Sequence, residues 1–285
     1  MDWKNRVVKS LFHGVISRNE QFKGRHNGET CYIIGNGASL KNMDLSAFAD
    51  RVTIGLNFLC IHRDFHKLNA PYYVVPAPKF LYPFYENPYL KKYQRNPTGM
   101  ALRRAIAQFS KTTVFTSITN IASLAMVREA FYIHHFGNTE PDRELCDISG
   151  VFSFMAGGLY GGIGVAINLG FKKAVLIGCD YVFTPKKDGH FYGAGPATRS
   201  DQRGNIYAEL FKEAREKIEL SLVTDTGGSE WLPSEEYEAY TGRKIQYREN
   251  HEIVDGANLK AFAQAYRQGM YKTPIFHTQK EGRSA

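Results

Sequence analysis

The 285-residue chain has few cysteines, and their spacing excludes the common cysteine frameworks. The four are Cys31, Cys60, Cys146 and Cys179, and no two of them form the Cys-x-x-Cys pair of zinc and redox sites. Cys31 and Cys179 lie in or beside apolar runs, where cysteine usually packs as a small hydrophobic side chain. This use of cysteine predicts a reduced, cytoplasmic protein without a cysteine-bound metal.

The chain also lacks the markers of several other protein classes. The N-terminus is charged and has no apolar segment of the secretory kind, so we expect no signal peptide. Arg-rich runs, zinc-finger spacing and aromatic RNA-binding signatures are missing, so we expect no nucleic-acid partner. The uncharged stretch 151–171 is long enough to span a bilayer, but its six glycines favour a buried turn and helix.

Positive charge, by contrast, is in excess. A formal net charge of +8 and a pI near 9.2 predict an anionic partner, such as a phosphorylated substrate or an acidic membrane surface. Trp3, Val7 and Leu11 recur at every fourth position among Lys and Arg residues, which predicts a basic amphipathic helix within residues 1–28. Its segment 1–18 fits either the protein's own core or the inner face of the cytoplasmic membrane, where the protein would be peripheral.

Short apolar runs that end in glycine or a polar residue predict the strands of an α/β fold. The runs cover residues 31–34, 51–57, 72–75, 114–117, 174–177 and 244–247, and helices are expected at 158–169 and 205–222. Their alternation predicts one doubly wound, mostly parallel, Rossmann-like domain over residues 29–275. Residues 79–110 are expected to form a helical lid, 184–204 a mobile loop and 276–285 a flexible tail.

The most informative motif is the apolar run 31–34 followed by Gly35-Asn36-Gly37-Ala-Ser39. The glycines let the backbone turn sharply, so that backbone N–H groups, the Asn36 amide and the Ser39 hydroxyl can converge on a phosphate or sugar. The motif is no P-loop, because no Gly-Lys-Ser/Thr follows, and the third glycine of the dinucleotide fingerprint is replaced. An ordinary strand-to-helix turn is the alternative. Because ligands of doubly wound sheets bind beyond the carboxyl ends of strands, Asn57 and Asp180 join the same predicted site.

Four segments together resemble a known family: Gly35-Asn-Gly-Ala-Ser-Leu, Asn57, Gly157-Gly-Leu-Tyr160 and the run from Leu169 to Asp180. They are similar to the bacterial sialyltransferases of the GT-A-like, metal-independent kind. Related families are the motility accessory factors that glycosylate flagellin and the archaeal hydroxymethylpterin pyrophosphokinases. The resemblance covers residues 30–60 and 150–195, and it implies a GT-A-like fold that binds a nucleotide sugar without a cofactor.

The resemblance also implies roles for single residues. The donor-binding set is Gly35, Asn36, Gly37, Ser39, Asn57, Gly157, Gly158, Gly178, Asp180 and Tyr181. His190 matches a histidine of the wider family and is the expected general base, since imidazole titrates near neutral pH. His251 is a weaker alternative base. Lys186, Lys187 and Arg199 are candidates to stabilise the leaving phosphate.

We therefore expect an inverting, metal-independent glycosyltransferase that moves a sugar from a nucleotide-activated donor, for example one like CMP-sialic acid, to a cell-surface glycan. One alternative is a pyrophosphokinase that transfers diphosphate from ATP to a small alcohol such as a pterin. It would need Mg²⁺ and carboxylate ligands, for which only Asp180 and Asp188 offer themselves. The other is a non-catalytic scaffold that binds nucleotide sugars. His62 and His66 have a zinc-site spacing without a following Glu, so we expect a surface or capping role. The oligomeric state stays open, including a homo-oligomer.

Overall fold

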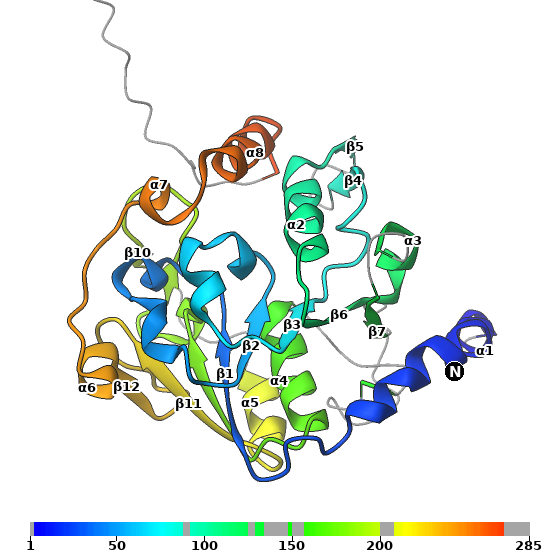
Figure 1. Cartoon of the computed structure of the whole chain (residues 1–285), viewed down its shortest axis with the longest axis horizontal. Coiled ribbons are helices and arrows are strands. Elements are labelled where there is room, and N and C mark those ends of the chain that lie inside the picture. Colours follow the sequence, from blue (N-terminus) through cyan, green and yellow to red (C-terminus); the bar gives the residue numbers. More distant parts are fainter. Residues whose placement is uncertain are drawn as a thin grey trace, which may run out of the picture.

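The computed structural model describes residues 3–87, 92–124, 129–133, 148–149, 157–199 and 208–270. Its centre is a sheet of eight strands in the order β12-β11-β8-β1-β2-β3-β6-β7, and every pairing in it is parallel (Figure 1). The strands are β1 (Thr30–Ile34), β2 (Thr53–Leu56), β3 (Tyr72–Val75), β6 (Thr113–Ser117), β7 (Phe131–Ile133), β8 (Lys173–Ile177), β11 (Glu219–Thr224) and β12 (Ser234–Glu236). The predicted Rossmann-like α/β fold with a doubly wound sheet is thus confirmed.

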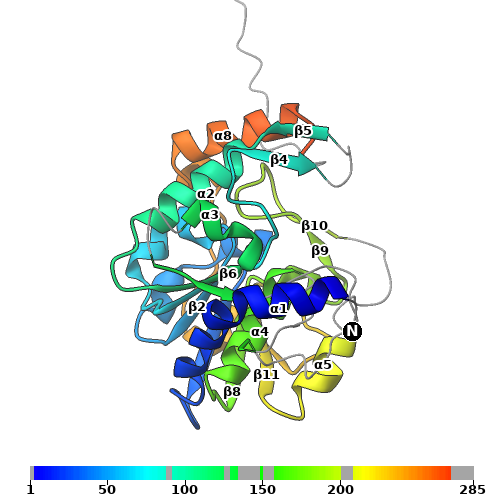
Figure 2. The same ribbon diagram turned by 90° about the vertical axis from the view of Figure 1, so that its right-hand side faces the viewer.

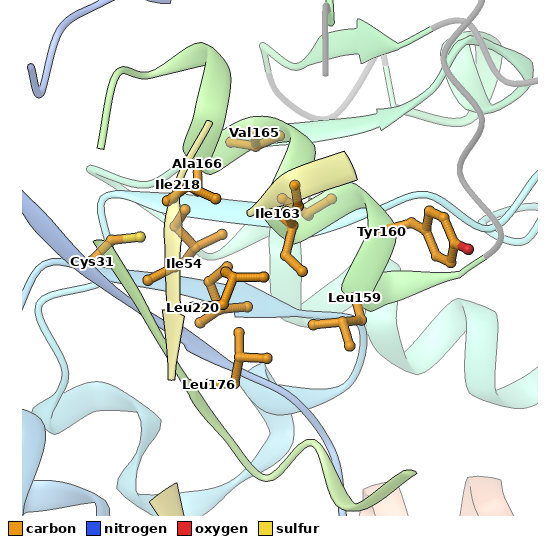
Figure 3. Packing of buried hydrophobic residues seen from close by; sticks show 14 of the residues in the cluster. Cys31, Ile54, Leu159, Tyr160, Ile163, Val165, Ala166, Leu176, Ile218 and Leu220 are labelled. Atoms are coloured by element: carbon orange, nitrogen blue, oxygen red, sulfur yellow. The ribbon is translucent and has the colours of Figure 1, made fainter. Parts of the chain in front are cut away.

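Both faces of the sheet are buried. In β1, Cys31 and Ile33 face one apolar core, whereas Tyr32 and Ile34 face the other. The first core is closed by helices α4 (Gly158–Asn168) and α5 (Ala208–Ala214), and Figure 3 shows side chains of α4 against those of the strands. The second core is closed by α2 (Pro97–Ala107) and α8 (Gly256–Arg267). Burial on both faces explains why the central strands consist of continuous apolar runs.

The order of the strands reverses at one place. The chain runs outward from β1 through β2, β3, β6 and β7, and then returns to place β8 on the other side of β1. The register puts Ile34 opposite Ile177, so the turns that follow β1 and β8 lie side by side. In open α/β sheets such a switch point forms a crevice at the carboxyl ends of the strands, where ligands bind.

The remaining elements surround this sheet. They are helices α1 (Trp3–Ile16), α3 (Ile121–Leu124), α6 (Tyr237–Thr241) and α7 (Asn250–Ile253), the hairpin β4 (Phe84–Asn87) and β5 (Lys92–Arg95), and the pair β9 (Lys187–Asp188) and β10 (Thr198–Arg199). Helix α1 contacts β7 and lies at that end of the sheet, far from β12 (Figures 1 and 2). Within the described ranges, no helix combines the length and the apolarity needed to cross a bilayer.

Two expected elements are wrong in their secondary structure. The helix expected at 205–222 ends at Ala214, and residues 219–224 form strand β11 instead. Ile218, Leu220 and Leu222 alternate with polar residues, which is the period of a strand covered by neighbours. The strand expected at 244–247 is an irregular segment that runs along residues 41–42. Only the N–H groups of Gln246 and Arg248 bond to that segment, so no ladder forms.

The expected lid, residues 79–110, contains the β4–β5 hairpin as well as helix α2. Helix α2 packs on α8, because Leu102, Ile106, Leu259 and Phe262 share the second core. None of the described residues of this segment lines the pocket at the switch point. Closure of this segment over a ligand therefore stays a prediction.

Candidate functional site

A pocket lies at the switch point, at the carboxyl ends of β1, β2 and β8. It holds about 480 Å³, part of it open solvent. Its lining consists of Gly35, Asn36, Gly37, Leu56, Asn57, Gly158, Leu159, Gly178, Cys179, Asp180, Tyr181, Val182 and His190. The structure thus brings together all residues of the expected site except Ser39 and Gly157. Gly157 is the residue before α4, and Ser39 lies below the pocket floor in a fully buried position.

The side chain of Asn36 links the end of β1 to the end of β2 by hydrogen bonds. Its side-chain NH₂ group donates to the Leu56 carbonyl at 2.7 Å, and its side-chain oxygen accepts from the Phe58 N–H at 2.7 Å. Both ends of the amide are therefore used within the protein. The sequence alone predicts that the Asn36 amide contacts a ligand. In the structure, this amide links the segments that follow β1 and β2.

Ser39 and Asp180 form a second link, between the loop after β1 and the end of β8. The Ser39 N–H donates to Asp180 Oδ2 at 2.8 Å, and the Ser39 hydroxyl donates to Oδ1. The sequence predicts that the Ser39 hydroxyl contacts the nucleotide sugar, but in the structure this hydroxyl contacts Asp180. Asp180 is only 1% exposed, and burial raises the pKa of its carboxyl to about 7. The two hydrogen bonds from Ser39 act in the opposite direction.

Two glycines of the pocket make room for protein groups. A Cβ at position 37 would lie 2.1 Å from Asp180 Oδ1, and a Cβ at position 158 would lie 2.4 Å from Asn57 Nδ2. Asn57 itself has φ of +47°, a left-handed conformation that is uncommon outside glycine. Such conformations occur often at functional sites, where the surrounding structure holds them. The backbone conformation of Asn57 therefore fixes the position of its side chain, which lies beside the first residue of α4.

The loop that follows β9 folds back over the motif and places His190 in the pocket. His190 forms an isolated antiparallel bridge with Gly37, and the Phe191 N–H donates to the Asn36 carbonyl at 3.1 Å. The imidazole lies beside Tyr181 and Tyr192, with ring centroids 6.3 and 5.0 Å away. Its Nδ1 atom is buried and has no hydrogen-bond partner among the described residues.

Burial also sets the protonation of His190. It lowers the pKa of the imidazole below its usual 6.5, against smaller opposite effects of a hydrogen bond with the Asn36 backbone and the charge of Asp188. The ring is therefore neutral at pH 7. A neutral imidazole in the lining of the pocket is able to accept a proton from a bound hydroxyl group.

Lys41 holds this loop in place, and nothing in the sequence distinguishes it from a surface lysine. Its side chain is fully buried, and Nζ donates to the carbonyls of Gly193, at 2.6 Å, and Gly195. Burial lowers the pKa of Lys41 to about 8, and the charge of Glu249, whose carboxylate lies 3.9 Å from Nζ, acts against that shift. Lys41 therefore joins the segment that follows the Gly35–Ser39 motif to the loop that carries His190.

The three basic residues that were expected to stabilise the leaving phosphate differ in their positions. Lys187 is buried and binds the Asp225 carboxylate and Thr226, so its predicted role at the phosphate is wrong. Lys186 lies 3.1 Å from Asp188 and 4.8 Å from the centre of the Tyr181 ring, which puts its charge at the rim of the pocket. The side chain of Arg199 lies outside the described part of the structure.

The other expected histidines stand apart from the pocket. His251 is exposed on α7 and does not line it. His62 is buried, contrary to the expected surface position, but its Nδ1 does cap a turn by accepting from the Asp64 N–H at 3.1 Å. His66 is exposed. Within the described ranges, no three His, Cys, Asp or Glu side chains gather as metal ligands do.

Helix α4 opens onto the pocket with its N-terminus. Gly157, at φ of +112°, precedes the helix and supplies no side-chain cap, and Gly158 and Leu159 line the pocket. The first turn of a helix carries N–H groups without intrahelical partners and the positive end of the helix dipole. This end of α4 and His190 both belong to the lining of the pocket.

The fold and this pocket define a Rossmann-like α/β protein with a ligand crevice at the switch point of its sheet. A scan against models of protein families and a search of curated proteins both found no match. Among solved structures, the sialyltransferase CstII from Campylobacter jejuni in complex with the substrate analogue cytidine-5'-monophosphate is 15% identical, with a TM-score of 0.38 over 85% of this chain and 98% of that one. A variant of the sialyltransferase Cst-II in complex with CMP is 17% identical, with a TM-score of 0.37 over 84% and 98% of the two chains. A likeness of this degree carries no argument about the ligand.

Proposed function

We propose that the chain is an inverting glycosyltransferase that uses a nucleotide-activated sugar and needs no metal ion. The observation that carries this proposal is that two features lie in the same pocket. The N-terminus of α4, where Gly157 supplies no side-chain cap, suits the phosphate of a nucleotide, and the neutral imidazole of His190 suits the hydroxyl proton of an acceptor. The resemblance of the Gly35–Ser39 segment to sialyltransferase motifs agrees with this assignment.

In the proposed reaction, His190 takes the proton from the acceptor hydroxyl as its oxygen attacks the anomeric carbon of the donor sugar. The bond between that carbon and the phosphate oxygen breaks, and its electron pair stays on the phosphate. The first N–H groups of α4 stabilise the negative charge that develops there, assisted by the ammonium group of Lys186 at the rim. Attack from the side opposite the leaving phosphate inverts the configuration of the sugar.

Calorimetric titration with CMP, UDP, GDP and ATP, each in EDTA and in Mg²⁺, tests the binding half of the proposal. We expect one of the first three to bind equally well in EDTA. Binding of ATP alone, and only with Mg²⁺, would support the pyrophosphokinase instead. A sugar nucleotide that binds without any turnover across a panel of glycan acceptors would support the scaffold.

Replacing His190 with Ala tests the catalytic half. Because the imidazole accepts a proton and does not hold the nucleotide, affinity for the donor should change little while turnover falls about a hundredfold or more. His66→Ala is the matched control, since His66 is exposed outside the pocket. Turnover of the His190 variant within a few-fold of wild type would exclude His190 as the base.

A further inference from the structure

Helix α1 has two apolar faces, and the described residues of the protein cover only one of them. Phe12 and Val15 pack on the second core, and Ile16 is fully buried. Trp3, Val7 and Leu11 are exposed instead, at 63%, 46% and 70%. Residues four apart lie one above another on a helix, so these three form a single stripe along its outer side.

The stripe is the main exposed apolar feature of the described residues. Of the other large exposed apolar side chains, Phe84 and Tyr93 share the β4–β5 hairpin, and Tyr247 lies in the segment between α6 and α7. Single exposed apolar residues are normal on a soluble protein, whereas a continuous row marks a surface that contacts something else. A helix that needed only to dock on its own core would require one apolar face, and α1 already has that face.

The charge of the same helix indicates what covers the stripe. From Trp3 to Ile16 the sequence contains Lys4, Arg6 and Lys9 and no Asp or Glu. A second copy of the chain would bring two such helices together, and their positive charges would repel each other. An anionic lipid surface attracts them and receives the apolar side chains at the same time. Tryptophan in particular favours the interface between lipid and water.

We propose that α1 docks the protein on an anionic phospholipid surface through Trp3, Val7 and Leu11. The helix lies at the β7 end of the sheet, where it projects from the right of the body in Figure 1 and faces the viewer in Figure 2, so a flat surface can reach it. The apolar residues enter the boundary between headgroups and acyl chains, and the lipid phosphates attract the positive charge of the helix sequence. The cores and the pocket described above stay on the water side, because none of their residues belongs to the stripe.

Sedimentation of the full chain with vesicles tests this docking. We expect binding to phosphatidylcholine vesicles that contain about 30% phosphatidylglycerol, at least about tenfold weaker binding to pure phosphatidylcholine, and release when the salt is raised to about 0.5 M. The combined variant Trp3→Ser, Val7→Ser, Leu11→Ser should lose binding by about tenfold or more. Its thermal unfolding should stay unchanged, because the three side chains are exposed.

The matched control replaces exposed aromatic residues elsewhere, as Phe84→Ser with Tyr93→Ser on the β4–β5 hairpin, and should bind like wild type. In a Trp231→Phe background, the fluorescence of Trp3 should shift to shorter wavelength on anionic vesicles and return in high salt. Absence of vesicle binding, equal binding to neutral vesicles, or equal losses in both variants would overturn the proposal. So would a dimer in light scattering that the α1 variant abolishes while vesicles bind neither protein. Neither nucleotide binding nor turnover enters these outcomes, so they are independent of the proposed enzyme activity.

Discussion

Replacing Asp180 with Asn tests whether burial governs the carboxyl group of this pocket residue. In the folded protein burial raises its pKa to about 7, from 3.8. The folded state then keeps the proton up to about pH 7, whereas the unfolded chain releases it near pH 3.8. The group therefore stabilises the fold most below pH 3.8, and this contribution is lost as the pH rises to about 7. A difference of about three pKa units corresponds to about 4 kcal/mol.

Asparagine has the same shape and no charge, so it avoids this loss. Its side-chain oxygen can accept from the Ser39 N–H, and its NH₂ group can donate to the Ser39 hydroxyl oxygen, which leaves both present contacts with a partner. We expect the free energy of unfolding of Asp180→Asn to rise relative to wild type between pH 4 and pH 7, by up to about 4 kcal/mol, and to level off above that range.

Urea unfolding at closely spaced pH values measures this difference. Asp50→Asn is the control, because Asp50 is exposed and water screens its charge. Asp180→Ala should lose stability at every pH, by about 1–3 kcal/mol for each Ser39 group left without a partner. A difference between Asp180→Asn and wild type that does not change with pH would refute the reasoning from burial.

Three further changes probe the loops around this carboxyl. Gly37→Ala should lower both the melting temperature and nucleotide affinity, because its Cβ would collide with Asp180, whereas Gly256→Ala, with open space around it, should do neither. Lys41→Met should cost about 2–4 kcal/mol in urea unfolding, since two buried carbonyls lose a charged donor, and unchanged stability would contradict the anchoring role. Because the pKa of His190 is lowered, transfer activity should persist as the pH falls to 6.5 and decline only below it, and a decline that starts above pH 7 would exclude His190 as the titrating base.

The central sheet was predictable because of how it is buried. Strands β1, β3 and β8 are covered on both faces, so each one is a largely apolar run that the sequence displays directly. Strands toward the edges carry weaker signals. All three residues of β12 are exposed, and β11 mixes polar with apolar residues after a helix. Burial, more than intrinsic propensity, therefore decided which strands the sequence predicts.

The location of the pocket was predictable for a related reason. Parallel strands end at one edge of the sheet, so polar residues and glycines that follow each strand must gather there. The partners of those residues were not predictable. Ser39 binds Asp180 across 141 positions of the chain, and Asn36 joins Leu56 and Phe58 on another strand. A local sequence pattern does not indicate whether a polar side chain faces a ligand or a neighbouring loop.

This distinction changes what mutations in the motif report. Asn36, Ser39 and Asp180 carry the strongest sequence signal, yet their polar atoms bind other protein groups. Other residues that line the pocket are Gly158 and Leu159 at the start of α4, Asn57 and His190. Backbone N–H groups bind a phosphate whatever base it carries, so they contribute affinity and little selectivity. Variants of Asn36 and Ser39 should therefore lower stability and ligand affinity together, whereas a change at His190 should lower kcat alone. A variant of Asn36 with weaker affinity and unchanged stability would place its amide on the ligand after all.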